Sequence, residues 1–66
     1  MTKNIGFKFK PTFESSIDYF EVRGFDHRRN WVLTTVHTKN GETFEDHIEQ
    51  ECYDAAFDIG EYERLL

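Results

Sequence analysis

TFEDHIEQECYDAAFDIG, residues 43–60, carries the most regular apolar pattern in this 66-residue chain. At about 100° per residue, the period of an α-helix, five of its apolar side chains fall on one stripe: Phe44, Ile48, Cys52, Ala55 and Ile59. We therefore expect one amphipathic helix over residues 44–59 that docks this stripe on a sheet. Thr43 stands where a capping residue belongs, and Gly60 stands where helices favour glycine after their last turn.

The side of this predicted helix opposite the stripe combines aromatic and acidic side chains. Tyr53 and Phe57, four residues apart, lie there as a pair. A helix that only packs inward has no need of aromatic groups on that side, whereas a binding surface uses them as anchors and surrounds them with charge. We therefore expect six residues to form a partner-binding surface: Asp46, Glu49, Tyr53, Asp54, Phe57 and Asp58.

The segments before residue 43 predict β-strands. IDYFEVRGF (17–25) and WVLTTVHT (31–38) are rich in β-branched and aromatic residues, and a polar turn over 26–30 joins them. GFKFK (6–10) predicts a short strand, which Pro11 ends or confines to a sheet edge. Strict alternation divides the first long strand into two faces: Ile17, Tyr19, Glu21, Arg23 and Phe25 on one, Phe20 and Val22 on the other.

Asn40-Gly41 is a strong hairpin signal and competes with the helix. Residues 42–48 could return as a full strand against 31–39, or a return of about two or three residues could precede the helix. We favour the short return because the helical stripe is regular. The expected fold is then α+β, with a two- to three-stranded antiparallel sheet followed by one amphipathic helix packed on one face. After Gly60, EYERLL is compatible with a last turn, a short strand or a docked tail.

One helix covers only one face of such a sheet, and the apolar residues of both strands fall on both faces. An antiparallel sheet tolerates a wet face, but that face is normally polar. Three coverings stay open for the second face: the N-terminal segment with Phe7, Phe9 and Phe13, a second copy of the chain, or a foreign partner.

Length and composition predict a single domain spanning residues 1–66. A chain of this size buries about 60% of its unfolded surface, so its core is near the lower limit of self-sufficiency. Its 38% hydrophobic and 17% aromatic content is too high for a disordered chain. Cys52 is the sole cysteine, which excludes an intramolecular disulfide. With no apolar run of membrane-spanning length, we expect a cytoplasmic protein without membrane association.

The charge is divided unequally along the chain. Residues 1–41 carry seven basic and four acidic groups, a balance of +3, whereas residues 42–66 carry nine acids against Arg64 alone, a balance of −8. The two halves give the net charge of −5. Such an acidic block is ordinarily a solvated face, but it also suits the recognition of a basic surface.

Catalytic and metal-binding patterns are weak. His47 and Cys52 are five residues apart, which separates them by about 140° around a helix and prevents an adjacent pair. The histidines and the cysteine lack the spacing of a structural zinc site. We therefore expect no enzymatic activity, no metal and no cofactor.

In size and charge, the chain resembles small acidic proteins that inhibit DNA- or RNA-handling enzymes and are often carried by phages and mobile elements. The resemblance implies a non-enzymatic inhibitor whose acids occupy a basic surface that normally holds nucleic acid. Two alternatives stay open. One is a structural or accessory homodimer without a nucleic-acid-related partner. The other is weak nucleic-acid binding by basic and aromatic residues of the N-terminal half, which the net negative charge opposes: Lys8, Lys10, Arg23, Arg28 and Arg29 with Phe7, Phe9, Phe25 and Trp31.

Overall fold

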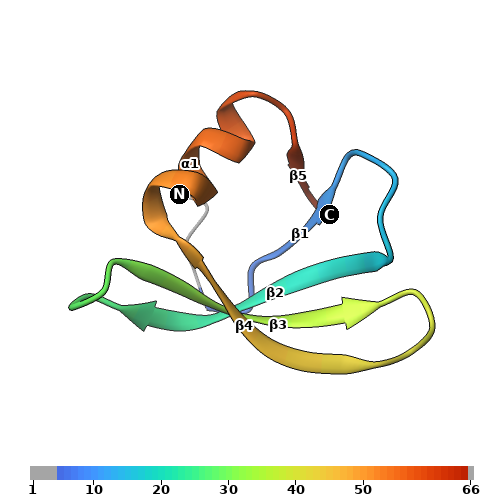
Figure 1. The fold of residues 1–66 in the computed structure, drawn as a ribbon, viewed down its shortest axis with the longest axis horizontal. Coiled ribbons are helices and arrows are strands. Elements are labelled where there is room, and N and C mark those ends of the chain that lie inside the picture. The colour runs from blue at the N-terminus through green and yellow to red at the C-terminus, as the bar shows by residue number, and fades with distance from the viewer. Residues whose placement is uncertain (1–4, 66) are drawn as a thin grey trace.

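The computed structural model describes residues 5–65, which form five β-strands and one α-helix (Figure 1). The strands are β1 (Lys8–Pro11), β2 (Ile17–Asp26), β3 (Trp31–Thr38), β4 (Thr43–Glu49) and β5 (Tyr62–Arg64), and the helix is α1 (Gln50–Asp58). All strand pairs are antiparallel, in the spatial order β4-β3-β2-β1-β5. The first four strands therefore form a meander, and β5 returns after α1 to the free side of β1.

The strands expected before residue 43 are confirmed. The two long strands are β2 and β3, joined by a turn after Asp26. GFKFK contributes β1, which ends at Pro11 but lies between β2 and β5 rather than at an edge. The tail after Gly60 takes the form of a short strand, since Tyr62–Arg64 pairs with β1, while Leu66 lies outside the described residues.

The expected architecture after residue 42 is wrong. Of residues 5–65, 52% are in strands and 15% in the helix, and there are five strands in place of two or three. Residues 43–49 form β4, which pairs with β3 from His37↔Thr43 to Trp31↔Glu49. The hairpin begins at the Asn40-Gly41 turn, where Gly41 has a φ of 90°. The long strand prevails because pairing with β3 satisfies the backbone groups of its even-numbered residues while Ile48 still reaches the core.

The helix is shorter than expected, and its buried face is the opposite one. Tyr53 and Ala56 are buried, whereas Cys52 and Ala55 are exposed and Ile59 has 69% of its surface accessible. The stripe prediction is wrong because Phe44 and Ile48, which set its phase, belong to β4. Thr43 is likewise no cap; Glu49 occupies the N-cap position without a side-chain hydrogen bond.

The predicted end of the helix is confirmed at Gly60. Gly60 has a φ of 81°, its N–H donates to the Phe57 carbonyl at 3.2 Å, and the Glu61 N–H donates to the Ala56 carbonyl at 2.8 Å. This pair of bonds is the Schellman arrangement, in which glycine adopts a left-handed conformation that other residues adopt at a cost.

Two irregularities in β2 reconcile its sequence with a single core face. The register against β3 shifts between Ile17 and Tyr19 and again between Val22 and Gly24. Each shift is a β-bulge, which adds a residue and changes the face to which later side chains point. The apolar residues at 17, 20, 22 and 25 all contact the core as a result. The face assignment from strict alternation is therefore wrong for Ile17 and Phe25.

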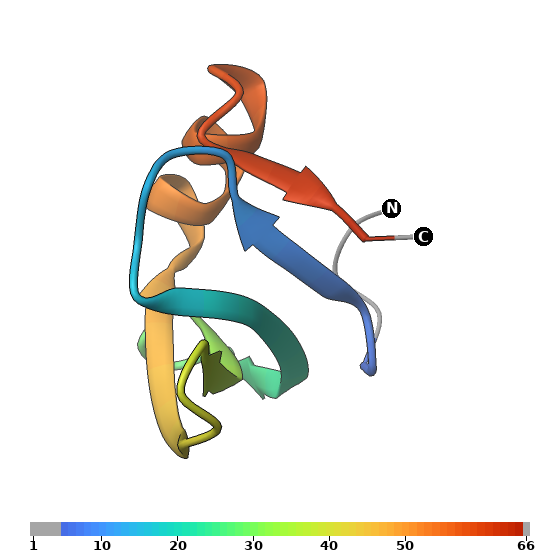
Figure 2. The ribbon, with the colours of Figure 1, turned by 90° about the vertical axis from the view of Figure 1, so that its right-hand side faces the viewer.

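The sheet is strongly bent around the core. In Figure 1, α1, β1 and β5 lie on one side of the layer formed by β2, β3 and β4, and Figure 2 shows β1 and β5 rising away from that layer. The concave side is filled by six buried residues: Phe9, Phe20, Val22, Val32, Val36 and Tyr53. Phe9 is central, with its ring centroid 4.8 Å from that of Phe20 and 5.3 Å from that of Tyr53.

The N-terminal aromatic residues pack on the same side of the sheet as α1. Phe9 is fully buried, Phe7 packs on the core, and Phe13 is 55% exposed. The hypothesis that these residues cover the second face of the sheet is therefore wrong for Phe7 and Phe9. Tyr62 joins the same core, and burial is the main cause that raises the pKa of its hydroxyl, followed by the charge of Glu61.

Candidate partner-binding surface

The aromatic pair predicted to anchor a partner lies in the core. Tyr53 has no accessible surface, and Phe57 is half-buried against Phe7, Phe9 and Tyr62. The expectation that Tyr53 and Phe57 form an exposed pair is therefore wrong, because the helix begins at Gln50 and its phase is reversed. The four acidic members of the predicted surface, Asp46, Glu49, Asp54 and Asp58, are all exposed.

Three acids follow one flank of α1. Glu51, Asp54 and Asp58 are spaced three and four residues apart, so they line up on the helix surface. The Gln50 side chain donates to both oxygens of Asp54 at 3.3 Å. Asp58 is the last helical residue, and the last turn carries no basic side chain. A carboxylate at that end is disfavoured by the helix dipole.

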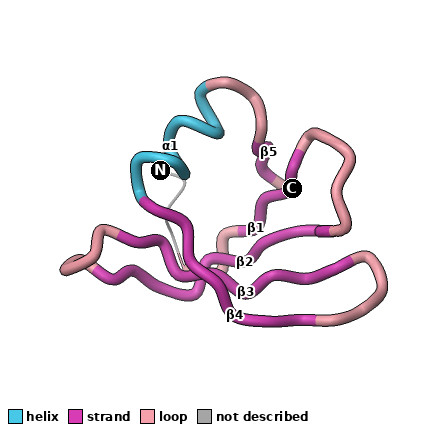
Figure 3. Tube along the Cα trace, viewed as in Figure 1, coloured by secondary structure: helices cyan, strands magenta, loops and turns pink. Residues whose placement is uncertain are grey.

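The second group of acids lies on β4, which leads directly into α1 (Figure 3). Glu45 accepts a hydrogen bond from the Thr35 hydroxyl at 3.0 Å across the strand pair. Asp46 accepts one from the backbone N–H of His47 at 2.8 Å. Glu49 lies at the end of the strand, with Oε1 3.9 Å from the Cys52 sulfur. We call residues 42–61, which contain both groups of acids, the acidic segment.

The basic residues of the N-terminal half make their ion pairs elsewhere. Within residues 5–65, the Lys and Arg ion pairs are Lys10–Glu63, Arg23–Glu21 and Arg29–Asp26. Asp26 also accepts the backbone N–H groups of Arg28 and Arg29, and these contacts with Arg29 hold its pKa below the ordinary value. No described Lys or Arg therefore pairs with seven carboxylates of the acidic segment: Glu42, Glu45, Asp46, Glu49, Glu51, Asp58 and Glu61.

The convex side of β2, β3 and β4 faces away from α1 and carries two stacked aromatic groups. Tyr19 stacks on His37 with centroids 4.2 Å apart, and Trp31 stacks on His47 at 3.6 Å. A cation lies near each pair, with the Arg29 guanidinium 5.1 Å from the Trp31 ring and the Lys8 amine 5.8 Å from the Tyr19 ring. We call this side the outer face. Among residues 5–65, no strand or helix covers it.

The sequence contains a signal for these stacked groups that the helix prediction concealed. If residues 43–49 are paired with β3 from the Asn-Gly turn, His47 falls opposite Leu33 and diagonally next to Trp31, which lies two residues from Leu33 on the same face. The assignment of residues 44–59 to a helix removed this pairing. His47 and Cys52 do not meet in the structure, since His47 stacks on Trp31 and Cys52 contacts Glu49.

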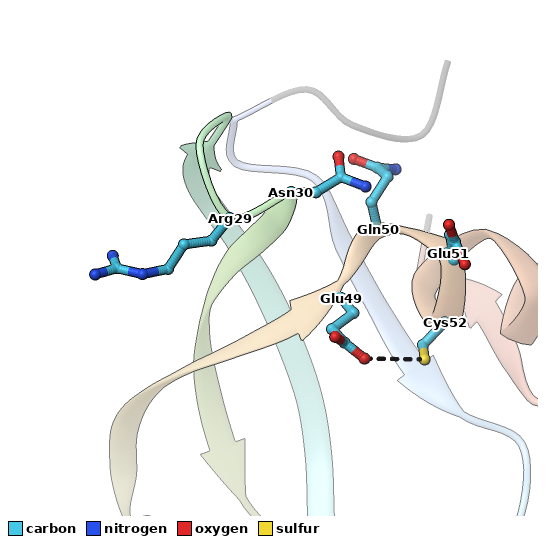
Figure 4. Close-up of a pocket in the computed structure, with 6 residues that line it drawn as sticks. All are labelled: Arg29, Asn30, Glu49, Gln50, Glu51 and Cys52. Carbon is cyan, nitrogen blue, oxygen red and sulfur yellow. Dashed lines mark hydrogen bonds between the residues drawn. The ribbon is translucent and has the colours of Figure 1, made fainter.

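A shallow pocket of about 150 Å³ lies where β4 joins α1 (Figure 4). It is lined by Arg29, Asn30, Glu49, Gln50, Glu51 and Cys52. The Gln50 N–H donates to the Asn30 carbonyl at 2.8 Å, and Asn30 adopts a φ of 60°. Cys52 is a free, exposed thiol and not the buried residue that the apolar stripe predicted.

Comparisons with family models, curated protein sequences and solved structures found no significant match for this chain. Over the described residues, no helix is long and apolar enough to span a membrane. The same residues contain no group of three His, Cys, Asp or Glu side chains placed to hold a metal ion.

Proposed function

We propose that this chain is a non-enzymatic binding module that uses the acidic segment to contact a protein with a basic surface. The observation that carries the proposal is the set of seven carboxylates that form no ion pair with a Lys or Arg of residues 5–65. Arg28, Arg29 and Lys39 are present in the same small fold, yet Arg29 pairs with Asp26 instead. Uncompensated charge of one sign opposes folding, so a use outside the fold accounts for its presence.

In this proposal, the apolar anchors are not Tyr53 and Phe57, which were expected from the sequence, but two other side chains. Phe44 on β4 is 48% exposed, and Ile59 after α1 is 69% exposed, and both belong to the acidic segment. An exposed apolar side chain with carboxylates around it has the composition of an interface anchor with a charged rim.

An inhibitor of a nucleic-acid-handling protein is one form of this function. A surface that neutralises phosphates with Lys and Arg also attracts closely spaced carboxylates, and salt weakens both interactions. We propose the cytoplasm as its location, since the exposed free thiol of Cys52 suits a reducing compartment.

The test uses two variants with the same change in net charge. Glu51→Gln with Asp58→Asn removes two charges from the acidic segment, and Glu14→Gln with Asp18→Asn removes two exposed charges outside it. The partner is captured from lysate of the native cell with the wild-type chain and then purified, and its Kd is measured at several salt concentrations. We expect the first variant to bind about two- to fivefold more weakly per charge removed, with a shallower salt dependence. Equal affinities for the two variants would contradict the proposal.

A second candidate function is homodimerisation, which the outer face favours. Trp31, Leu33 and Tyr19 are half-buried there, and the face lacks a covering element within residues 5–65. Two copies that meet through it would bury these side chains, as a twofold interface does.

A further inference from the structure

Within residues 5–65, the edge of the sheet formed by β4 has a long row of backbone groups without a neighbouring strand. β4 pairs with β3 on one side only, and the spatial order places it at the end of the sheet. The opposite edge, β5, has three residues, whereas β4 has seven, six of them exposed. An edge of this kind is a template for one further strand.

The hydrogen bonds at both ends of β4 show which of its backbone groups point outward. The Thr38 N–H donates to the Glu42 carbonyl at 2.9 Å, and the Gln50 N–H donates to the Asn30 carbonyl at 2.8 Å. Since hydrogen-bonded and non-hydrogen-bonded pairs alternate along an antiparallel ladder, the backbone N–H and C=O groups of even-numbered residues from 42 to 50 point toward β3. The N–H and C=O groups of four residues therefore point to the free edge: Thr43, Glu45, His47 and Glu49. The bond from the His47 N–H to its neighbour's carboxylate, Asp46 Oδ1, agrees with this phase.

The charges beside this edge determine what can occupy it. Side chains alternate across β4, so Glu45 and Glu49 lie on the outer face and Asp46 lies on the other side of the sheet. A strand added here is flanked by carboxylates on both sides. A second copy of β4 would place acids opposite acids, which is unfavourable. A basic segment would place ammonium or guanidinium groups opposite these carboxylates. The negative charge that opposes pairing with a second β4 therefore attracts a basic segment.

We propose that the β4 edge takes up an extended basic segment of a partner protein as a sixth strand. This proposal rests on the proposed function and names how the acidic segment contacts its partner. Main-chain bonds to the outward groups of β4 supply the affinity, and alternate basic side chains supply the selectivity. When a basic side chain pairs with Asp46, the Asp46 carboxylate moves away from the His47 N–H. That N–H is then free to donate a hydrogen bond to a carbonyl of the added strand.

The experiment uses chemical synthesis, which a 66-residue chain permits. The probe is an acetylated and amidated octapeptide of alternating Lys and Val. Its control has D-Val at each valine, so that the charge is kept and a regular strand is prevented. The protein is compared with a version N-methylated at Glu45, which blocks an outward N–H and keeps the carboxylate. A matched version is N-methylated at Glu14, an exposed residue in the connection between β1 and β2.

We expect the all-L peptide to bind the unmodified chain about tenfold more tightly than the D-Val peptide, which corresponds to one or two hydrogen bonds. The Glu45 N-methyl version should lose about the same factor, and the Glu14 version should lose none. On the unmodified protein, the peptide should slow hydrogen exchange at the amides of Glu45 and Glu49 and leave those of Phe44 and Ile48 unchanged. This NMR measurement remains decisive if the modified chain does not fold.

Two outcomes would overturn the strand addition. In the first, both peptides bind equally and the edge amides keep their exchange rates, while Glu45→Gln still weakens binding. The contact is then electrostatic, and the proposed function stands without the sixth strand. In the second, no peptide binds at low salt. The proposed function has a separate test. It fails if the captured partner binds the Glu51→Gln/Asp58→Asn variant and the Glu14→Gln/Asp18→Asn control with equal affinity.

Discussion

Tyr53 illustrates how burial of one side chain governs this small core. Its ring packs edge-on against two others, with its centroid 5.3 Å from that of Phe9 and 5.1 Å from that of Phe57, and none of its surface is accessible. In a chain near the lower size limit for a self-sufficient core, one such aromatic side chain supplies a large share of the apolar burial.

Tyr53→Ala should therefore lower the free energy of unfolding by about 3–5 kcal/mol, because it leaves a cavity among aromatic rings. Ile59→Ala is the matched control, since Ile59 is 69% exposed and should change stability by less than about 0.5 kcal/mol. Urea denaturation followed by circular dichroism measures both. A larger loss for Ile59 than for Tyr53 would mean that the helix packs through the opposite face.

Asp26 is a second residue with a testable role. Its pKa is lowered from the ordinary 3.8, first by the backbone N–H of Arg29 and then by the Arg29 side chain. A carboxyl with a lowered folded pKa stabilises the protein above its unfolded pKa, and this contribution is lost as pH falls through the folded pKa. We expect Asp26→Asn to lower the denaturation midpoint at pH 7. The difference from wild type should begin to shrink near pH 3.8 and vanish once the pH is below the lowered pKa of the folded state. A difference that persists at the lowest pH would assign the effect to geometry rather than charge.

At the scale of elements, the β3–β4 hairpin determines where the helix can begin. The turn at Gly41 requires a φ of 90°, which L side chains adopt at a cost, and β4 then uses the residues that a longer helix would need. The bulge near Gly24 acts in the same way on β2, since it brings Phe25 to the core face.

The two glycines should respond to alanine in opposite directions. Gly41→Ala should cost about 1–2 kcal/mol from backbone strain alone, since a Cβ there meets no atom within 4 Å. Gly24→Ala should leave stability unchanged or raise it by up to about 1 kcal/mol, since its Cβ meets Leu33 Cδ1 at an ordinary 3.9 Å. Thermal denaturation of both variants checks this. A costly Gly24→Ala with a harmless Gly41→Ala would contradict the hairpin.

The ends of α1 permit a similar comparison of charge. Asp58→Asn should raise the free energy of unfolding by about 0.3–1 kcal/mol, since it removes a negative charge from the negative end of the helix dipole. Glu51→Gln in the first turn should lower it by a similar amount. Denaturation at low salt shows both effects most clearly. A loss of stability in Asp58→Asn would show that this carboxylate serves the fold and would weaken the proposed function.

At the scale of the whole molecule, net charge and the outer face act in opposite directions on self-association. The face has half-buried aromatic groups to bury, while two chains of charge −5 repel each other. We expect self-association that strengthens as salt screens this repulsion, whereas binding to a basic partner weakens. Sedimentation equilibrium at micromolar concentration and two salt levels measures it, with Leu33→Glu as the variant that removes the dimer. A monomer mass at both salt levels would exclude the second candidate function.

Local patterns in the sequence were sufficient for several features. β2 and β3 follow from their composition, the hairpin from Asn40-Gly41, and the end of α1 from Gly60, because propensity and turn geometry act over a few neighbouring residues. The acidic block was also visible, since counting charge requires no fold. The tertiary structure decided the rest. Residues 43–49 satisfy both a helical and a strand pattern, and pairing with β3 selects the strand. The bulges in β2 and the return of β5 to β1 depend on contacts between distant residues. Those contacts buried Tyr53, exposed Cys52 and, within residues 5–65, left the edge of β4 free.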